Sequence, residues 1–442
     1  MTTVPQLAAT LQTVFTTMAD IAARTTGFVQ RRSKLTGAAF VQALVFGWLA
    51  NPHASIAALA QAAVVIGVAI SPQGLDQRCT EVAAAFLEEV LGAAVQAVIA
   101  AEPVAIPLLQ RFTAVVLLDC STIVLPDALG LWWPGCGGSS VTHTQAALKL
   151  GVRFDLCSGA LRGPLLYDGR THESTTPLQS APLPAGALRL ADLGFFDLDV
   201  LAQIGAADGY WLWRLHCTTA VYDADGRRWD VLDLLAAQGA VAQVDLPLAL
   251  GAQQRLPARL LAVRVPQEVA DQRRRRLRAD ARDRGRTPSA ARLAWCDWTI
   301  LVTNVPPALL SLREALVLAR ARWQIELLCK LWKSQGHIAE SRSGKPWRVL
   351  CEVYAKLLAM VVQHWLLLTG CWAYPDRSLV KAAQTVRHHA LHLASALAGP
   401  AALEDVIALL HRCLAAGCRL NRRRKKPNTY QLLLDPTLGA LD

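Results

Sequence analysis

The sequence predicts a mixed α/β core set between two mainly helical regions, and three observations lead to this prediction. Residues 1–111 and 341–442 are rich in alanine, leucine and valine, which is typical of packed helices. Between them lie short, strongly apolar runs that end at polar residues, which is typical of strands buried on both faces of a sheet. Hydrophobic residues make up 53% of the 442 residues, which indicates folded domains rather than extended disorder.

The first helical region carries a basic group immediately before its apolar run at residues 35–49. The group consists of Arg31, Arg32 and Lys34. Cations at the start of a helix suit contact with nucleic-acid phosphates, although a solvated surface patch has the same composition. We therefore regard residues 1–111 as a candidate DNA-binding region.

The core is expected to begin with residues 112–217. The predicted order is a strand over 112–118, a hairpin over 147–167, a strand over 188–191, a helix over 196–204 and a strand over 210–217. Strands mixed with a helix in this order predict an α/β sheet rather than a bundle or a sandwich.

Residues 218–305 differ in sequence pattern from the preceding segment. They contain short strand-like runs and turn signals, which predict an inserted, mainly β subdomain. The insertion closes on a strand at Trp298–Thr303. A long helix over Leu309–Ser334 follows, within a second core segment at 306–340. Residues 341–442 are predicted to be helical with a basic tail.

The charge pattern indicates a polyanionic partner. The formal net charge is +11, and the cations cluster at residues 31–34, 273–278 and 422–426. Several such blocks in one chain favour DNA or RNA as the partner. Polar residues such as Glu88, Glu89, Lys356 and His364 interrupt the apolar stretches, which argues against a membrane span.

The eleven cysteines are spread along the chain without a CxxC pair. A disulfide framework or a zinc ribbon would need regular short spacings. The cysteines therefore predict buried free thiols in a reducing, cytoplasmic protein.

Three acids are the candidate catalytic residues. Asp119 and Asp192 each follow a predicted buried strand, and Glu326 lies in the predicted long helix. Carboxylates at the ends of adjacent strands suit a pair of Mg²⁺ ions, because hard cations take oxygen ligands. An aspartate after a strand is also a common helix cap or turn former.

Glu326 shares one stripe of its helix with three cations. At about 100° per residue, Arg322 lies about 40° from Glu326 and about 20° from Lys333 around the helix axis, and Lys330 lies about 80° from Arg322. This pattern fits a metal-binding carboxylate flanked by cations for phosphate oxygens. An ordinary ladder of i, i+4 ion pairs would give the same pattern.

These residues resemble the bacterial insertion-sequence DDE transposases, in particular the group with the YREK signature. The signature is Tyr, two residues, Arg, three residues, Glu, six residues and Lys. Arg322, Glu326 and Lys333 keep this spacing, whereas Ala319 stands in the place of the tyrosine. The departure removes one phosphate contact that the family pattern would supply.

The resemblance extends over about residues 112–340. It includes Leu-Leu-Asp119, Ala-Asp192-Leu-Gly-Phe-Phe and the segment Trp298–Asn304. The acids follow one another at separations of 73 and 134 residues, and the longer separation contains the expected insertion.

The resemblance implies an RNase H-like core and metal-dependent cutting and joining of DNA. Asp119, Asp192 and Glu326 would bind two Mg²⁺ or Mn²⁺ ions, while Arg322 and Lys333 would hold the DNA backbone. In relatives that pass through a DNA hairpin, a tryptophan of the insertion stacks on a flipped base. Trp298 is the first candidate for that role and Trp295 the second, although either could belong to the strand core.

The implied partners are double-stranded DNA, meaning the element's terminal repeats and its target, and a second copy of the chain. The implied location is the cytoplasm, on the nucleoid when DNA is bound. A structure-specific nuclease would share the three acids but would not need two flanking helical regions. A non-catalytic DNA-binding protein would explain the charge but not the three acids in order.

Overall fold

The computed structural model describes residues 1–31, 34–136 and 145–438. The chain divides into two units, each built from segments that are distant in the sequence. Unit 1 consists of Met1–Ala105, Asp119–Thr171 and Ile325–Asn421. Unit 2 consists of Ile106–Leu118, His172–Gln324 and Arg422–Asp442.

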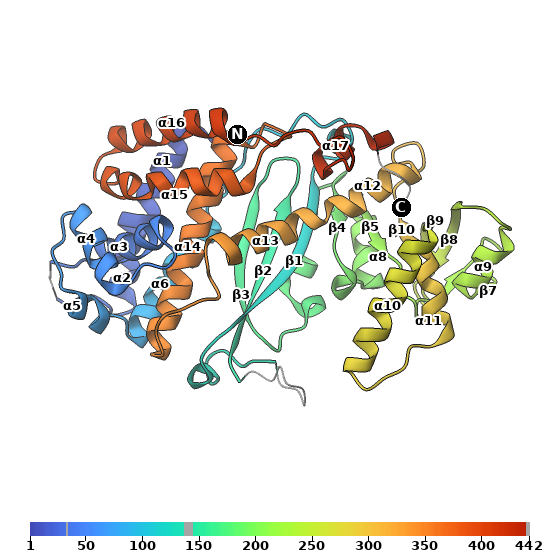
Figure 1. Ribbon diagram of the computed structural model, residues 1–442, viewed down its shortest axis with the longest axis horizontal. Coiled ribbons are helices and arrows are strands. Elements are labelled where there is room, and N and C mark those ends of the chain that lie inside the picture. The colour runs from blue at the N-terminus through green and yellow to red at the C-terminus, as the bar shows by residue number, and fades with distance from the viewer. Residues whose placement is uncertain (32–33, 137–144, 439–442) are drawn as a thin grey trace. The chain divides into compact units, whose positions relative to one another are not determined.

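The strands form a mixed sheet in the order β3-β2-β1-β4-β5-β10-β9-β8-β6-β7 (Figure 1). Their bounds are β1 Val115–Val124, β2 Ala147–Asp155, β3 Leu161–Asp168, β4 Leu188–Leu190, β5 Tyr210–Arg214, β6 Val221–Tyr222, β7 Arg228–Trp229, β8 Gln243–Leu250, β9 Leu256–Arg264 and β10 Trp298–Thr303. β2 and β3 are antiparallel, whereas β1, β4 and β5 are parallel neighbours. This order and direction of the first five strands confirm the α/β prediction and are consistent with an RNase H-like core.

Unit 1 is mainly helical, as predicted for both ends of the chain. Its helices are α1 Val4–Gln12, α2 Ala19–Thr25, α3 Gly37–Ala50, α4 Ile56–Val65, α5 Pro72–Gln77, α6 Glu81–Gln96, α13 Trp323–Gln335 (from Ile325), α14 Pro346–Cys371, α15 Leu379–Ala396 and α16 Pro400–Gly417. α14 is the central element and packs against α3, α6 and α16 (Figure 1). It is long and apolar enough to cross a membrane, but its apolar stretch is completely buried inside the protein, which is the position of a core helix.

Unit 2 combines strands β4 to β10 with seven helices among its described residues. These are α7 Pro177–Ser180, α8 Leu198–Ala206, α9 Val231–Ala237, α10 Gln267–Asp283, α11 Ala290–Ala294, α12 Leu312–Ala321 and α17 Thr429–Leu434. Within the predicted inserted segment, β8, β9 and β10 pair antiparallel. The arginine run of that segment lies in α10 rather than in strands or turns. Gln267 and Arg274 both bond Asp271 on this helix, and such i, i+3 and i, i+4 pairs support helix formation.

Two local predictions differ from the structure near the candidate acids. β1 does not stop at Asp119 but continues to Val124, because its second half runs beside β2. The predicted single helix over 309–334 is instead two helices, α12 and α13, which meet at Arg322. Asp119 is therefore an in-strand residue, and Glu326 lies in the first turn of its helix.

All eleven cysteines are free thiols, as predicted. Five of them are buried, whereas Cys136 and Cys217 are exposed. The prediction of uniformly buried thiols is therefore wrong for these two positions, which lie outside the regular elements.

Candidate active site

Asp119 lies where β1 changes from an apolar to a polar strand. Val115–Leu118 are buried, while Asp119 and the three residues that follow are half-buried. The Asp119 carboxylate accepts a hydrogen bond from the thiol of Cys329 in α13. Burial and the negative charge of Asp119 raise the pKa of Cys329 to about 12, so this group remains a protonated donor at neutral pH.

The same face of α13 contacts β1 at a second point. Lys333 Nζ donates to the backbone oxygen of Thr122 at 3.1 Å. Glu326, Cys329 and Lys333 are spaced i, i+3 and i+7, so they form one stripe along the helix. Cys329 and Lys333 meet β1, and Glu326 lies on the same stripe of α13, one turn before Cys329.

Asp192 follows β4 and is held by its own turn. Its side chain accepts a hydrogen bond from the backbone N–H of Gly194 at 2.9 Å, and the indole N–H of Trp213 donates to its backbone oxygen at 3.0 Å. A Cβ on Gly194 would overlap Glu173 Oε2 and lie 3.1 Å from Asp192 Oδ1. Glycine is therefore required for the close approach of the Glu173 carboxylate to this turn.

A buried arginine supports the loops around Asp192. Arg189 of β4 is 1% exposed and donates to the backbone oxygens of Gln179 and Ala181 at 2.8 and 2.6 Å. The Gln179 side chain in turn donates to the oxygen of Phe195 at 2.8 Å. These bonds link both chain segments that flank the aspartate to the buried Arg189 and Gln179 side chains.

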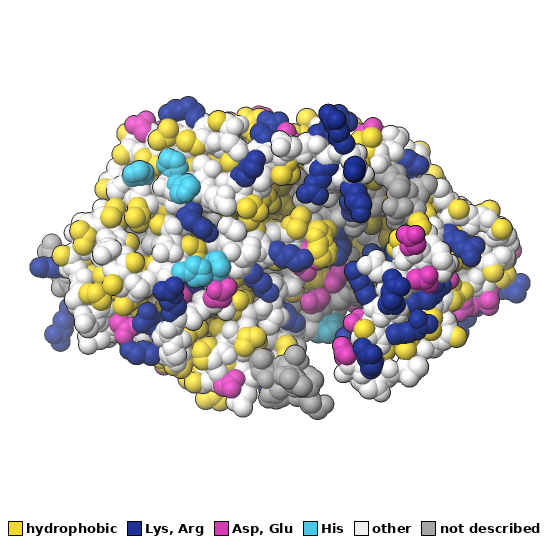
Figure 2. Space-filling view, in the orientation of Figure 1, with side chains coloured by type: hydrophobic (Ala, Val, Ile, Leu, Met, Phe, Trp, Pro, Cys, Tyr) yellow, Lys and Arg dark blue, Asp and Glu magenta, His cyan; other side chains and the backbone are white. Residues whose placement is uncertain are grey.

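Asp192 lines a cavity of about 850 Å³ within unit 2, together with a large excess of cations. The cationic side chains among its described lining residues are Arg214, Arg273, Arg313, Arg320, Arg322, Lys425 and Lys426. Two of the basic clusters seen in the sequence thus contribute to one cavity, through α10 and through the C-terminal segment. Lys and Arg side chains gather over α10 and around α17 in Figure 2. An acid among seven cations suits a polyanion whose phosphates need neutralising.

The other predicted residues lie at several places. Trp298 at the start of β10 is half-buried, with the Arg264 guanidinium 5.9 Å from its ring centre. Trp295 lies in the short turn before that strand. Lys330 is on the exposed face of α13.

The predicted N-terminal basic group is only partly described. Arg31 lines a smaller cavity of about 380 Å³ with Arg78, and Lys34 is exposed. Arg32 lies outside the described residues. Ala319 lines the larger cavity beside Arg322, so a tyrosine at this position would project into that space.

Comparison with known proteins decides the family. A family model described as "Transposase DDE domain" matches residues 110–362, which is more than half of the chain and includes all three candidate acids. The chain belongs to the DDE transposase family. As a DDE transposase it acts on DNA and depends on divalent metal ions.

Curated insertion-sequence transposases are similar to this transposase, two of the following three over most of its length. The transposase of IS231F from Bacillus thuringiensis subsp. israelensis is 24% identical over 440 residues, which covers 93% of this chain and 91% of the relative. The transposase of IS1151 from Clostridium perfringens is 21% identical, covering 79% and 77%. The putative transposase InsL of IS186A from Escherichia coli K12 is 28% identical over 183 residues, covering 40% and 50%.

The sequence did not predict several of the side chains that contact the candidate acids. Cys329, Glu173 and Trp213 contact Asp119 or the Asp192 turn, but each looks like an ordinary core or surface residue in its own segment. For Arg189, the sequence offered one signal of a buried, functional position, which is a single charged residue within a short apolar strand. The contribution of Arg273 and Lys425 to one cavity depends on contacts between segments far apart in the chain.

Proposed function

We propose that this transposase cuts and rejoins DNA ends with Asp119, Asp192 and Glu326 as the ligands of two Mg²⁺ or Mn²⁺ ions. The observation that carries the proposal is the position of the segment from Arg322 to Lys333. Arg322 lines the cavity that contains Asp192, and four residues later Glu326 begins the helix stripe that reaches Asp119 through Cys329. Along the chain, Glu326 therefore lies between a residue that lines the Asp192 cavity and the two helix residues that contact the strand of Asp119, and this order supports the proposal.

The donor atoms suit the proposed ions. Asp119, Asp192 and Glu326 offer carboxylate oxygens, which Mg²⁺ and Mn²⁺ prefer. The Cys329 thiol lies beside Asp119 as a hydrogen-bonding neighbour and is not one of the three proposed ligands. Bound metal ions would activate a water molecule or a DNA 3′-OH and stabilise the oxygen that leaves.

The cations have complementary roles in this proposal. Arg322 and the other basic side chains of the Asp192 cavity hold backbone phosphates in place for in-line attack. Lys330 extends this surface along the exposed side of α13. Lys333 holds α13 against β1 through the oxygen of Thr122, and its ammonium keeps further donor capacity for a phosphate.

The remaining regions complete the handling of DNA. Trp298, with Trp295 as the second candidate, is proposed to stack on a base flipped out during a hairpin step. Residues 1–111 bind the element's ends through Arg31 and Lys34, together with Arg32, and residues 341–442 help to pair subunits. The enzyme works in the cytoplasm and joins the nucleoid when it binds DNA.

The test is a cleavage and joining assay with the terminal repeats that flank the gene. The purified chain should cut a duplex carrying such an end, and should join that end to a plasmid, only when Mg²⁺ or Mn²⁺ is present. Chelation of the metal should stop both reactions, and added metal should restore them. Cleavage of branched or flapped DNA without any end joining would favour the nuclease alternative.

We further expect two copies of the chain on paired ends. Joining two ends of one element needs two active sites held together, whereas the charge of +11 opposes close pairing until phosphates neutralise it. Light scattering should therefore give a monomer without DNA and a 2:2 complex with an end duplex. A complex that stays 1:1 at saturating DNA would contradict the paired-end proposal.

A further inference from the structure

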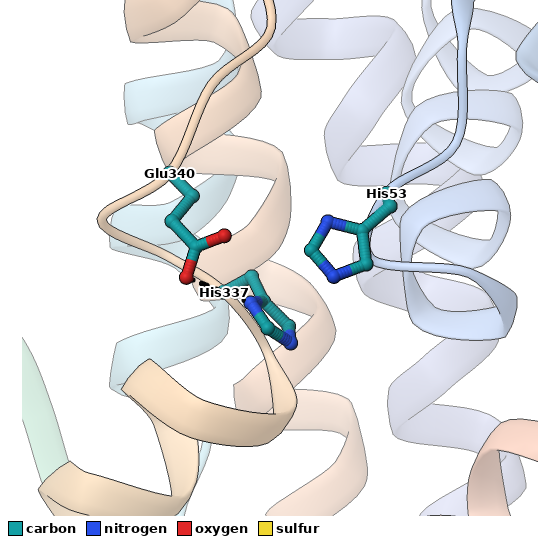
Figure 3. Close-up of side chains that lie close together, drawn as sticks. All are labelled: His53, His337 and Glu340. Carbon is teal, nitrogen blue, oxygen red and sulfur yellow. Dashed lines mark hydrogen bonds and ion pairs between the residues drawn. The ribbon is translucent and has the colours of Figure 1, made fainter.

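Unit 1 contains a second cluster of ligand-type side chains, which includes none of the proposed catalytic acids. His53 lies in the loop between α3 and α4, and His337 and Glu340 lie in the turn that follows α13. One potential ligand atom of each side chain lies within 4.8 Å of those of the other two. Figure 3 shows the three side chains directed toward one another from the two loops.

The contacts within the cluster are already short. The imidazole rings of His53 and His337 have their centres 4.0 Å apart, and His337 Nδ1 is 2.9 Å from Glu340 Oε1. A four-coordinate zinc ion, with bonds of about 2.0–2.1 Å, holds its ligand atoms roughly 3.3 Å apart. Small side-chain rotations would therefore place all three ligand atoms around one ion.

Both loops are held by their backbones rather than by these side chains. The His53 N–H donates to Asn51 Oδ1 at 3.0 Å. On the other side, buried Lys356 donates to the backbone oxygens of His337 and Glu340 at 3.0 and 2.8 Å. The Lys356 ammonium also pairs with Glu352 at 2.7 Å, which offsets part of the positive charge that it places near His53.

His337 also has a backbone conformation that side chains seldom adopt. Its φ is +47°, in the left-handed region that costs most residues free energy and that persists where the surroundings enforce it. This conformation ends α13 and turns the imidazole toward His53.

We propose that His53, His337 and Glu340 bind a divalent transition-metal ion, with zinc as the first candidate and water as the fourth ligand. Two imidazoles and one carboxylate are a ligand set for zinc and similar ions, whereas Mg²⁺ prefers oxygen alone. The site is distinct from the catalytic carboxylates in its chemistry. It would tie the α3–α4 loop to the end of the helix that carries Glu326.

The experiment is zinc titration of the full chain by calorimetry, without DNA and in excess MgCl₂ so that oxygen-only sites are occupied. We expect one zinc ion per chain, and a rise of about 5 °C in the unfolding temperature at saturation. His53→Ala and Glu340→Gln should each weaken zinc binding by at least about tenfold. His337→Asn should do the same, and asparagine tolerates the positive φ.

The matched control is His172→Ala, an exposed histidine whose ring bonds Ser174 at 2.7 Å, and it should bind zinc as the unmodified chain does. Unfolding without zinc should be similar in the control and in His53→Ala, which would show that the fold is intact.

Co²⁺ serves as a second probe, because its absorption spectrum distinguishes nitrogen and oxygen ligands from thiolates. Unchanged zinc affinity in His53→Ala and His337→Asn, or a thiolate spectrum from the free cysteines, would overturn the proposal. Neither outcome bears on DNA cleavage.

Discussion

Glu326→Gln should lower the rate of DNA strand cleavage by about a thousandfold or more while leaving the affinity for end DNA nearly unchanged. Glutamine keeps the shape of the side chain but removes the charge that a metal ligand supplies. Metal coordination contributes several kcal/mol in the transition state, and each 1.36 kcal/mol changes the rate about tenfold. End affinity depends instead on many distributed phosphate contacts.

Single-turnover cleavage and a gel-shift assay on the same duplex measure the two effects separately. Asp119→Asn and Asp192→Asn should behave as Glu326→Gln does. Glu268→Gln is the control, because Glu268 is an exposed acid in the first turn of α10. If Glu326→Gln still cuts DNA, another residue must be the third ligand, and Glu173 beside the Asp192 turn becomes the first alternative.

Lys356→Met should destabilise the protein by about 3–5 kcal/mol, because it leaves a buried charge without its partner. The Lys356 side chain is 1% exposed and that of Glu352 is 7% exposed, and their charged atoms are 2.7 Å apart within α14. The substitution would also remove the donor for the backbone oxygens of His337 and Glu340. Urea unfolding followed by circular dichroism measures the change.

Lys345→Met is the matched control for this prediction. Lys345 pairs with Asp76 at 2.6 Å, but its side chain is 72% exposed, so its loss should change stability by no more than about 1 kcal/mol. A double variant that also replaces Glu352 with methionine should recover part of the loss, since no buried charge then remains. Equal effects of Lys356→Met and Lys345→Met would show that the buried pair does not stabilise the fold.

Local sequence patterns predicted the elements whose determinants are local. The β-branched run Trp298–Thr303 forms β10 with the predicted bounds, and the two runs around Cys157 form the β2–β3 hairpin. β2 and β10 are buried along most of their length, so their hydrophobic pattern is sufficient evidence. The helical ends of the chain follow from composition in the same way.

The features that were not predicted depend on partners elsewhere in the chain. Asp119 was predicted to follow the end of its strand because the residues after it are polar. In the structure β1 continues beyond Asp119, beside β2. No proline or glycine lies at Arg322, so the sequence did not predict that α12 and α13 are separate helices. The three candidate acids were recognisable from spacing and resemblance. The cations of the Asp192 cavity come from β5, α10, α12, the α12–α13 junction and the C-terminal segment, which only the folded chain brings together.

The central position of α14 has a consequence for synthesis of the protein. α3 is apolar on all sides, and in the folded chain α14 and α15 cover it. α14 begins 250 residues after α6 ends, so a ribosome that adds roughly 5–20 residues per second makes it between roughly 10 and 50 s later. During that interval α2 and α4 can already pack against α3, but the faces that α14 and α15 cover remain exposed, and aggregation competes with folding. Soluble yield of the transposase should therefore depend on chaperones that bind nascent chains, and it should fall when translation between residues 97 and 345 is slowed.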